Sequence, residues 1–380
     1  MPLSGAMRLP GPPGTAVAGA VQDEPTPAWR ILDAARPGEA AAWEALWRSW
    51  PGREVMAHPE YARLFARACD RVVCFVGRGE GWNVMLPLIL RPLGAEPWAG
   101  PGEERWDAAS PYGYGGPFTW GEGARGDATF WARYAAWCRQ ERVISTMLRL
   151  SVVPGQLAAV PPVVTPRQQN VVCALDGGPD AVWARYRPNA RNNVRHARRA
   201  GVTVEVDETG AGLDAFLDVY RHTMRRRAAE GWYFLPRAFF EQLVARLSGQ
   251  FAFFLARLGG EVVSSELVLC SAENAYAFLG GTRAEHFPAR PNDLLRHEVA
   301  AWAAARGKLR YVLGGGYRGG DGVYRHKLAF APHGVVPFRV ACLVHDARAC
   351  EEQVRARLAF AEATGQTWAP REGYCPPYRG

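Results

Sequence analysis

Apolar and polar residues alternate with two different periods in the first half of the chain. Apolar residues at helical spacing predict helices over 40–50, 59–69 and 130–140. Runs rich in β-branched and aromatic residues predict strands over 71–76, 82–93 and 146–153, with the first two forming an antiparallel hairpin. Pro87 in the second run indicates an edge position or a bulge, because proline cannot donate a hydrogen bond to a neighbouring strand.

The second half of the chain repeats this mixture of helices and strands. Helical spacing predicts helices over 181–201, 213–228, 236–247 and 294–306. Strand patterns cover 169–175, 202–206, 251–258, 262–270 and 275–280, the last three in antiparallel order. The two halves therefore share one α/β (α+β) plan, although no literal sequence repeat is visible.

A proline-rich stretch at 154–166 is the best candidate for a domain boundary. A chain of 380 residues, 48% of them hydrophobic, suits two domains with buried cores. We expect a flexible leader over 1–26, one domain over 27–165, and a second domain with a C-terminal tail over 166–380. Prolines and glycines interrupt the leader, so it does not resemble a signal peptide. No apolar run reaches the roughly 20 residues that span a bilayer, and we expect no membrane insertion.

The cysteine spacing and the net charge indicate the cellular compartment and the kind of binding partner. The eight cysteines are scattered without C-x-x-C pairs or zinc spacing, which favours reduced thiols in a cytoplasmic protein. The net charge of +8 comes from arginine, because lysine occurs only at 308 and 327. Guanidinium groups match phosphate geometry, so a polyanionic partner such as RNA is one interpretation of this excess.

The densest basic segment runs from Arg185 to Arg199, with six arginines and His196. At helical spacing Arg191, Arg195 and Arg198 share one face, next to a stripe of small apolar residues. No acidic residue lies between positions 180 and 205 to balance them. The pattern indicates contact with an anion, and a plain solvated face is the alternative.

Two further segments combine aromatic residues with helix or loop ends. Thr223 and Arg226 share a helix face just before Trp232 and Tyr233, an aromatic pair that could stack on a base or a sugar or could close the core. The segment 107–118 interleaves Tyr112 and Tyr114 with glycines and prolines. It fits a rigid turn or a loop that lines a groove.

The stretch 309–332 contains the second of the two lysines. A short apolar run ends in three glycines, a second glycine cluster follows, and then come Tyr324, His326 and Lys327. Glycines 314, 316 and 319 match G-x-G-x-x-G, but no helix or acidic residue follows at the required distance, so a nucleotide loop is rejected. We predict a strand end and a turn that place Lys327 toward a cleft shared with the other domain.

These residues resemble the Fem-type (FemX-like) aminoacyltransferases of the GNAT-like acyl-N-acyltransferase superfamily. Four motifs carry the resemblance: R-x-x-x-R-x-A-x-x-x-G-V, T-x-x-R at a helix end, a helix leading into Y-x-L-G-G, and G-V-x-x-H-K-x-x-F. They lie at 191–202, 223–226, 294–315 and 322–330. The first half, with its SPYGYGGP loop, is similar to the N-terminal domain of the same group, whereas the family's coiled-coil arm is not evident.

The resemblance implies two tandem GNAT-like domains, each a mixed, largely antiparallel sheet flanked by helices. It also implies transfer of an amino acid from aminoacyl-tRNA to an amine acceptor, either a peptide such as a peptidoglycan precursor or a small natural-product intermediate. No cofactor is expected beyond this co-substrate, and we expect a monomer. The lysine of the closing motif, here Lys327, lies at the family's reaction centre, and His326 replaces the phenylalanine of relatives.

The chemistry of the residues agrees with such a transfer. Aminolysis of an ester passes through an oxyanion, and a preorganised cation near it is worth roughly 3–4 kcal/mol. We expect Lys327 to be that cation, with His326 or a substrate phosphate moving protons. The substrate-binding candidates are Arg191, Arg195, Thr223, Arg226, Tyr233, Tyr112, Tyr114 and Tyr324.

Two other classes of function stay open. One is an acyl-CoA-dependent N-acyltransferase of the same fold, and the other is a non-catalytic RNA-binding protein. Acyl-CoA users present a glycine-rich loop to the pyrophosphate at a helix N-terminus. The corresponding segment here, 283–295, contains no glycine, which counts against acyl-CoA.

Overall fold

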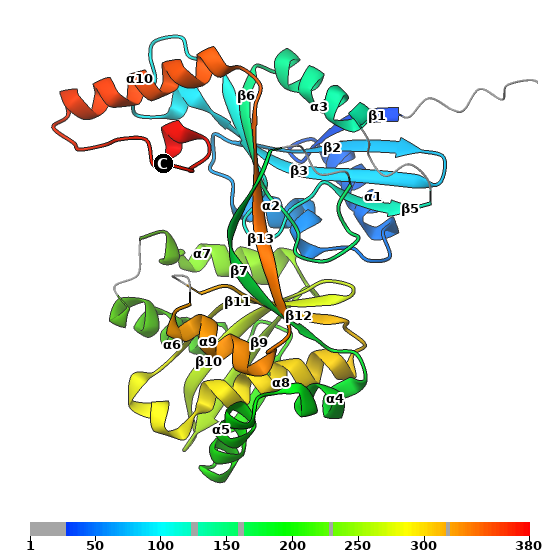
Figure 1. Cartoon of the computed structure of the whole chain (residues 1–380), viewed down its shortest axis with the longest axis vertical. Helices are drawn as coiled ribbons and strands as arrows, with labels where there is room; N and C mark the ends of the chain where they lie inside the picture. The colour runs from blue at the N-terminus through cyan, green and yellow to red at the C-terminus, as the bar shows by residue number, and fades with distance from the viewer. Residues whose placement is uncertain (1–27, 123–127, 159–162, 228–230, 317–319) are drawn as a thin grey trace, which may run out of the picture.

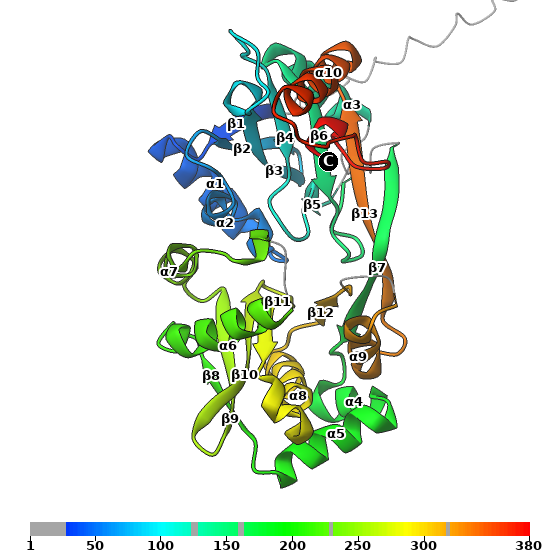
Figure 2. The ribbon, with the colours of Figure 1, turned by 90° about the vertical axis from the view of Figure 1, so that its left-hand side faces the viewer.

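The computed structural model describes residues 28–122, 128–158, 163–227, 231–316 and 320–380. The predicted leader and Gly319 lie outside these residues. The described strands join into one mixed 13-stranded sheet with helices on its faces (Figure 1). This confirms the predicted α/β architecture, and the second half is organised around one sheet region with α4, α5, α8 and α9 on one face and α6 and α7 on the other (Figure 2).

The first half supplies the upper part of the molecule in Figure 1. Its strands are β1 (Ala28–Asp33), β2 (Arg71–Gly79), β3 (Trp82–Pro92), β4 (Trp106–Ala109), β5 (Phe118–Gly121) and β6 (Val143–Arg149). Its α-helices are α1 (Pro37–Ser49), α2 (Pro59–Leu64) and α3 (Ala128–Gln140). The predicted helices and strands of this half are therefore present, although α2 ends earlier than predicted.

The second half forms the lower part and then returns to the upper one. Its strands are β7 (Val164–Ala174), β8 (Thr203–Asp207), β9 (Phe251–Leu258), β10 (Glu261–Cys270), β11 (Asn274–Thr282), β12 (Arg310–Gly314) and β13 (Val335–Val344). Its α-helices are α4 (Gly178–Arg185), α5 (Pro188–Arg199), α6 (Leu213–Arg226), α7 (Arg237–Arg246), α8 (Pro291–Ala305), α9 (Gly322–Phe330) and α10 (Ala347–Ala363). No helix among the described residues combines the length and apolarity needed to cross a bilayer.

The last strand connects the two halves of the sheet. The strand order is β1-β2-β3-β4-β6-β13-β7-β12-β11-β10-β9-β8, with β5 paired to β3. Residues 335–341 of β13 pair with β7, and residues 340–344 pair with β6. The domain boundary near residue 165 stays a prediction. The topology adds that the C-terminal segment, including α10, packs on the first half (Figure 1).

Pro87 is accommodated by an interruption in the pairing of β3. On one side β3 pairs continuously with β2, where Pro87 faces Cys74. On the other side residues 82–85 pair with β5 and residues 89–92 pair with β4. Pro87 lies in the interval between them, where no pairing is needed from its missing N–H. The strand is therefore internal, and the predicted edge exists only locally.

Two helical predictions need correction. The stretch predicted as one helix over 181–201 is two helices, because the residue before Pro188 is held in an extended conformation (Arg187, ψ 151°). The turn predicted around Lys327 is instead the helix α9. Asp321 caps it by accepting a hydrogen bond from the backbone N–H of Tyr324 at 2.8 Å. Asp321 was a visible capping signal that the glycines around it obscured.

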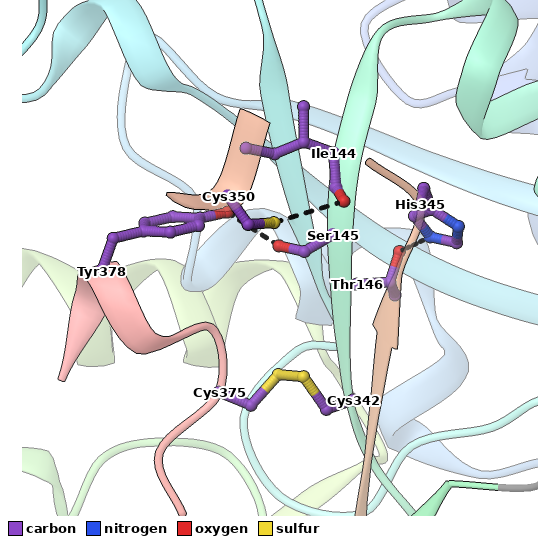
Figure 3. Close-up of a disulfide and its surroundings, with 8 residues drawn as sticks. All are labelled: Ile144, Ser145, Thr146, Cys342, His345, Cys350, Cys375 and Tyr378. Atoms are coloured by element: carbon purple, nitrogen blue, oxygen red, sulfur yellow. Dashed lines mark hydrogen bonds between the residues drawn. A yellow bond between two sulfur atoms is a disulfide. The ribbon is translucent and has the colours of Figure 1, made fainter. Parts of the chain in front are cut away.

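A disulfide between Cys342 and Cys375 contradicts the expectation that all thiols are reduced (Figure 3). It joins β13 to the C-terminal tail, with a Cα–Cα distance of 5.9 Å, and the six other cysteines are free. Tyr378 in the same tail shares a 2.7 Å hydrogen bond with Ser145 of β6 (Figure 3). The tail is thus fastened to the first half, and cysteine spacing alone gave no signal for this pair.

Candidate active site

The candidate site begins where two parallel strands separate. Strands β11 and β12 pair only over residues 274–276 and 310–312. Beyond this point β11 continues to Thr282, whereas β12 ends at Gly314 in a left-handed conformation (φ +74°). A side chain would strain that conformation, so glycine suits the position where the chain turns away. We call the region where the two strands separate the opening.

Lys327 reaches this opening from α9. Its Nζ donates a hydrogen bond to the carbonyl oxygen of Gly315 at 2.7 Å. A Cβ atom placed on Gly314 would lie 3.6 Å from Lys327 Nζ and 3.4 Å from Tyr114 Oη. The lysine ammonium and the tyrosine hydroxyl therefore flank the same backbone turn, and one of the ammonium's three N–H groups is used by Gly315.

The first half contributes Tyr114 through the SPYGYGGP loop. Its hydroxyl accepts a 2.8 Å hydrogen bond from Nδ2 of Asn170 on β7. Its ring packs on Tyr276 and Phe338, with ring centroids 5.6 Å apart in both pairs. The loop thus lies between the two halves, and Tyr114 is beside Lys327 as a groove-lining residue would be.

Tyr112 lies on the same loop but in a different environment. Its ring packs against Phe65 and Phe278, with centroid distances of 5.7 and 6.1 Å. The guanidinium carbon of Arg149 lies 5.8 Å from its ring centroid. Tyr112 therefore belongs to an aromatic cluster between the halves, and its predicted substrate-binding role stays a prediction.

Buried charges beneath the opening tune Lys327. Burial, together with the nearby Arg296 guanidinium, lowers the pKa of Lys327 to about 7, while Glu266 and Asp321 oppose the change. Arg296 and Glu266 are themselves buried, with 3.6 Å between Nη2 and Oε2. Tyr311 donates a hydrogen bond to Glu266. Lys327 is therefore able to exist as an ammonium or as a free amine near neutral pH.

His326 does not face the same opening as Lys327. Adjacent helical residues point about 100° apart, and His326 Nε2 lies 3.3 Å from Oδ1 of Asp293 on α8. Asn193 of α5 donates to the same carboxyl oxygen at 3.1 Å. Burial alone would raise the pKa of Asp293, but His326 and Asn193 hold it below its ordinary value. His326 thus connects α9 to α8 and α5.

The arginine-rich helix α5 is amphipathic as predicted, with Ala190, Val194 and Ala197 buried. However, Arg191 donates to the carbonyl oxygens of Ala184 and Tyr186 at 2.9 and 2.7 Å, so it caps the end of α4. Nη1 makes both contacts, so Arg191 has a structural role at the end of α4, and its predicted contact with an anion stays a prediction.

The other two arginines of the predicted row differ from Arg191. Arg195 lies over the ring of Trp183 at 5.4 Å, and Arg198 pairs with Glu298 at 2.9 Å. Arg198 therefore has an acidic partner on α8, far from it in the sequence. Arg195 forms no ion pair with any described residue.

The T-x-x-R pair fastens α6 to the end of β11. Thr223 Oγ1 accepts a 3.0 Å hydrogen bond from the N–H of Thr282. A Cβ atom at Gly281 would lie 2.3 Å from Thr223 Oγ1, so this contact requires glycine. The guanidinium carbon of Arg226 lies 5.0 Å from the ring centroid of Phe287. Thr223 and Arg226 thus shape the far edge of the opening.

Tyr233 and Tyr324 each make contacts with other parts of the second half. The backbone carbonyl of Tyr233 accepts a 2.6 Å hydrogen bond from the hydroxyl of Tyr220. The side chain of Tyr324 packs against the core on the α8 side of the sheet. The predicted substrate-binding roles of both residues stay predictions.

Several buried polar residues near Lys327 were not predicted from the sequence. They are Asn170, Glu266, Asp293, Arg296 and Tyr311. Glu266 stands inside an apolar strand run, and Arg296 stands among apolar residues of α8. A charged residue at an inward-facing position is a usable signal, because such a residue is rarely buried without a partner. No group of His, Cys, Asp or Glu in the described part of the chain is arranged to hold a metal ion.

Part of the second half matches a known protein family. Residues 184–328 match the family model described as an acetyltransferase (GNAT) domain. The match runs from α4 to α9 and includes Lys327 and the separating strands. Residues 184–328 therefore form a domain of the acetyltransferase (GNAT) type. A search of curated protein sequences finds no match.

Solved structures extend the likeness in fold to most of the chain. The crystal structure of FemX has a TM-score of 0.61 and 12% identity, covering 83% of this chain and 98% of FemX. A conserved protein of unknown function from Bacteroides thetaiotaomicron has a TM-score of 0.51 and 11% identity, with 80% and 97% coverage. A tandem GNAT protein from the clavulanic acid biosynthesis pathway follows at 0.45 and 12%, with 84% and 99% coverage. The FemX likeness shows a shared fold across both halves.

Proposed function

We propose that this protein transfers an amino acid from aminoacyl-tRNA to an amine acceptor, with Lys327 at the reaction centre. The observation that carries the proposal is the position of Lys327 Nζ, beside Gly314 where β11 and β12 separate and next to Tyr114 from the other half. The fold shared with FemX supports the choice of donor. The acceptor belongs to the class of small-molecule or peptide amines.

The chemistry requires one new bond and one broken bond. The acceptor nitrogen attacks the ester carbonyl of the aminoacyl group, and the tetrahedral oxyanion collapses with loss of the ribose oxygen, which takes up the proton from the nitrogen. Lys327 as an ammonium has N–H groups beyond the one bonded to Gly315 that can donate to this oxyanion. Binding of an anionic substrate favours the ammonium, because a nearby negative charge raises a lysine pKa.

The N-terminus of α8 argues against acyl-CoA as the donor. In a pyrophosphate site the first backbone N–H groups of the helix point at the phosphates. Here Pro291 removes one of them, and the Asp293 carboxyl in the first turn is held ionised by His326 and Asn193. No glycine occurs from 283 to 306 to let a phosphate approach the backbone. A diphosphate at this helix end would therefore meet a negative charge.

Exposed arginines support an RNA donor. Arg187, Arg195 and Arg199 on or beside α5 are exposed and form no ion pair with a described residue. Such unpaired guanidiniums bind phosphates with release of counterions, which makes binding sensitive to salt. These residues lie on the same side of the sheet as α9, which carries Lys327. A tRNA contacting α5 is thus compatible with a 3′ end at the opening.

A second candidate is an acyl-CoA-dependent N-acyltransferase, favoured by the description of the matched family as an acetyltransferase. One assay separates the two. Purified protein is incubated with an amine pool and either aminoacylated tRNA or acetyl-CoA, and products are identified by mass spectrometry. We expect an amide product with charged tRNA that disappears after RNase treatment. A product that depends on acetyl-CoA and resists RNase would overturn the proposal.

A further inference from the structure

A pocket lies between the two halves, at the opposite end of β12 from Lys327. Its volume is about 280 Å³. The first half lines it with Trp50, Trp120 and Val153, and the second half with Glu273 and Arg310. Arg310 is the first residue of β12 and Gly314 the last, so about 13 Å of strand separates the pocket from the lysine. The pocket is therefore distinct from the candidate active site.

Two opposite charges line this pocket without meeting each other. The Glu273 carboxylate makes no hydrogen bond or ion pair with any described residue. The Arg310 guanidinium has one weak contact, 3.4 Å from Nη1 to Oδ1 of Asn274. No ion pair joins Glu273 to Arg310, although both face the same space. A ligand with a cationic and an anionic end would satisfy both groups.

Two tryptophans, Trp50 and Trp120, form one side of the pocket, and the indole N–H of Trp50 is a free hydrogen-bond donor there. Trp50 is 3% exposed and stacks on Trp120 with ring centroids 5.3 Å apart and planes at 16°. Its indole N–H has no acceptor among the described residues. A Cβ atom on Gly52 would lie 3.3 Å from Trp50 Nε1 and 3.7 Å from Glu273 Oε1. Glycine at this position thus keeps open the space between the indole donor and the carboxylate.

Neighbouring polar groups are already engaged elsewhere. Lys308 Nζ donates to the carbonyl oxygens of Ser271 and Ala272 at 2.6 and 2.9 Å. Gln156, also in the pocket wall, donates to the buried Glu54 at 2.5 Å. The groups left to recognise a ligand therefore include the Glu273 carboxylate, the Arg310 guanidinium and the Trp50 indole N–H.

We propose that this pocket binds a free α-amino acid as its zwitterion. The ammonium group lies on Glu273, the carboxylate lies between Arg310 and the Trp50 N–H, and the side chain packs on Trp120 and Val153. The volume is just below the roughly 300–1,000 Å³ of drug-sized sites, which suits a ligand of this size. Binding here joins the two halves of the protein and does not depend on the proposed transferase activity.

Isothermal titration calorimetry of the full chain with each of the common amino acids tests this site. We expect at least one amino acid to bind with a Kd of about 1 mM or tighter. Its N-acetyl derivative, which lacks the ammonium, and its C-terminal amide, which lacks the carboxylate, are expected to bind at least about tenfold more weakly. Binding of no amino acid, or equal binding of the blocked derivatives, would overturn the proposal.

Three variants locate the binding. Glu273→Gln and Arg310→Gln are each expected to weaken binding about tenfold or more, because a charge-assisted hydrogen bond is lost in each. Gly52→Leu is expected to abolish binding by filling the space beside Trp50. Glu261→Gln, at an exposed position on β10, is the matched control and is expected to leave the affinity unchanged. Unchanged affinity in the three pocket variants, with circular dichroism confirming their folds, would refute the assignment.

Discussion

Replacing Lys327 with methionine tests both the stability cost and the role of this amine. Folding lowers its pKa from 10.5 to about 7. At about 1.36 kcal/mol per pKa unit, the difference of about 3.5 corresponds to at most about 5 kcal/mol. Between pH 7 and pH 10.5 the lysine of the unfolded chain is protonated, whereas that of the folded protein is largely neutral. The lysine therefore destabilises the fold most below pH 7, and the penalty disappears as the pH rises past 10.5.

The assay is urea unfolding of the wild type and of Lys327→Met from pH 6 to pH 10. We expect the variant to be more stable at pH 6 by about 2–5 kcal/mol, with the difference shrinking as the pH rises. Lys308→Met is the matched control, because lysine occurs only at these two positions. It leaves two carbonyl oxygens without their donor and is expected to lower stability. A Lys327→Met variant less stable than the wild type at pH 6 would refute the reasoning.

Kinetics of the same pair report on the catalytic role. Loss of an oxyanion donor is expected to lower kcat at least about a hundredfold in Lys327→Met, whereas Lys308→Met retains turnover. If the ammonium is the active form, kcat/KM of the wild type falls as the pH rises through about 7. A rate that rises through this pH would show that the free amine acts as a base instead. Isotope-labelled lysine gives two side-chain signals for NMR titration, assigned with the control variant.

Three further predictions concern the surroundings of the lysine. His326→Phe is expected to keep kcat within about tenfold, because His326 faces α8 and not the opening, as kinetics with saturating substrates would show. Arg195→Ala with Arg199→Ala is expected to raise KM for tRNA and to reduce the slope of log KM against log salt by about 2, as measured across a salt series. Glu266→Gln is expected to lower stability by about 3–5 kcal/mol in urea unfolding, because Arg296 is left buried without its ionised partner.

Each of these has a contradicting outcome. A loss of activity in His326→Phe as large as that in Lys327→Met would indicate that His326 takes part in proton transfer. An unchanged salt slope in the double arginine variant would remove α5 from the RNA-binding surface, with the paired Arg198 as the control position. A fully stable Glu266→Gln would mean that the buried ion pair contributes little.

Local patterns in the sequence predicted most of the secondary structure. The local pattern located the antiparallel strands β9, β10 and β11, because each is rich in apolar and β-branched or aromatic residues and is bounded by turn residues. The pairing of β13 with β6 was not predictable in this way. It joins residues 340–344 to residues 145–149, and no local pattern encodes a contact over such a separation. The disulfide from Cys342 to Cys375 depends on the same long-range arrangement.

The site was predictable in part for a related reason. Lys327 stands out because lysine is so rare in this chain, and the closing motif resembles a known family. The sequence did not show that Lys327 and His326 point in different directions. The segment was predicted as a turn, because the capping role of Asp321 was overlooked. The bonds from Arg191 to two backbone carbonyls were not predictable, because only the three-dimensional structure brings these groups together. The sequence therefore identifies the charged residues, whereas their contacts depend on tertiary packing.

The most direct test of the central claim is single-turnover transfer from purified aminoacyl-tRNA. Excess enzyme is mixed with tRNA carrying a radiolabelled amino acid and an amine pool, and label in amide products is followed with time. We predict rapid transfer by the wild type, transfer at least about a hundredfold slower by Lys327→Met, and none after RNase treatment. Transfer at equal rates by wild type and variant, or label that stays on the tRNA while acetyl-CoA yields product, would contradict the account.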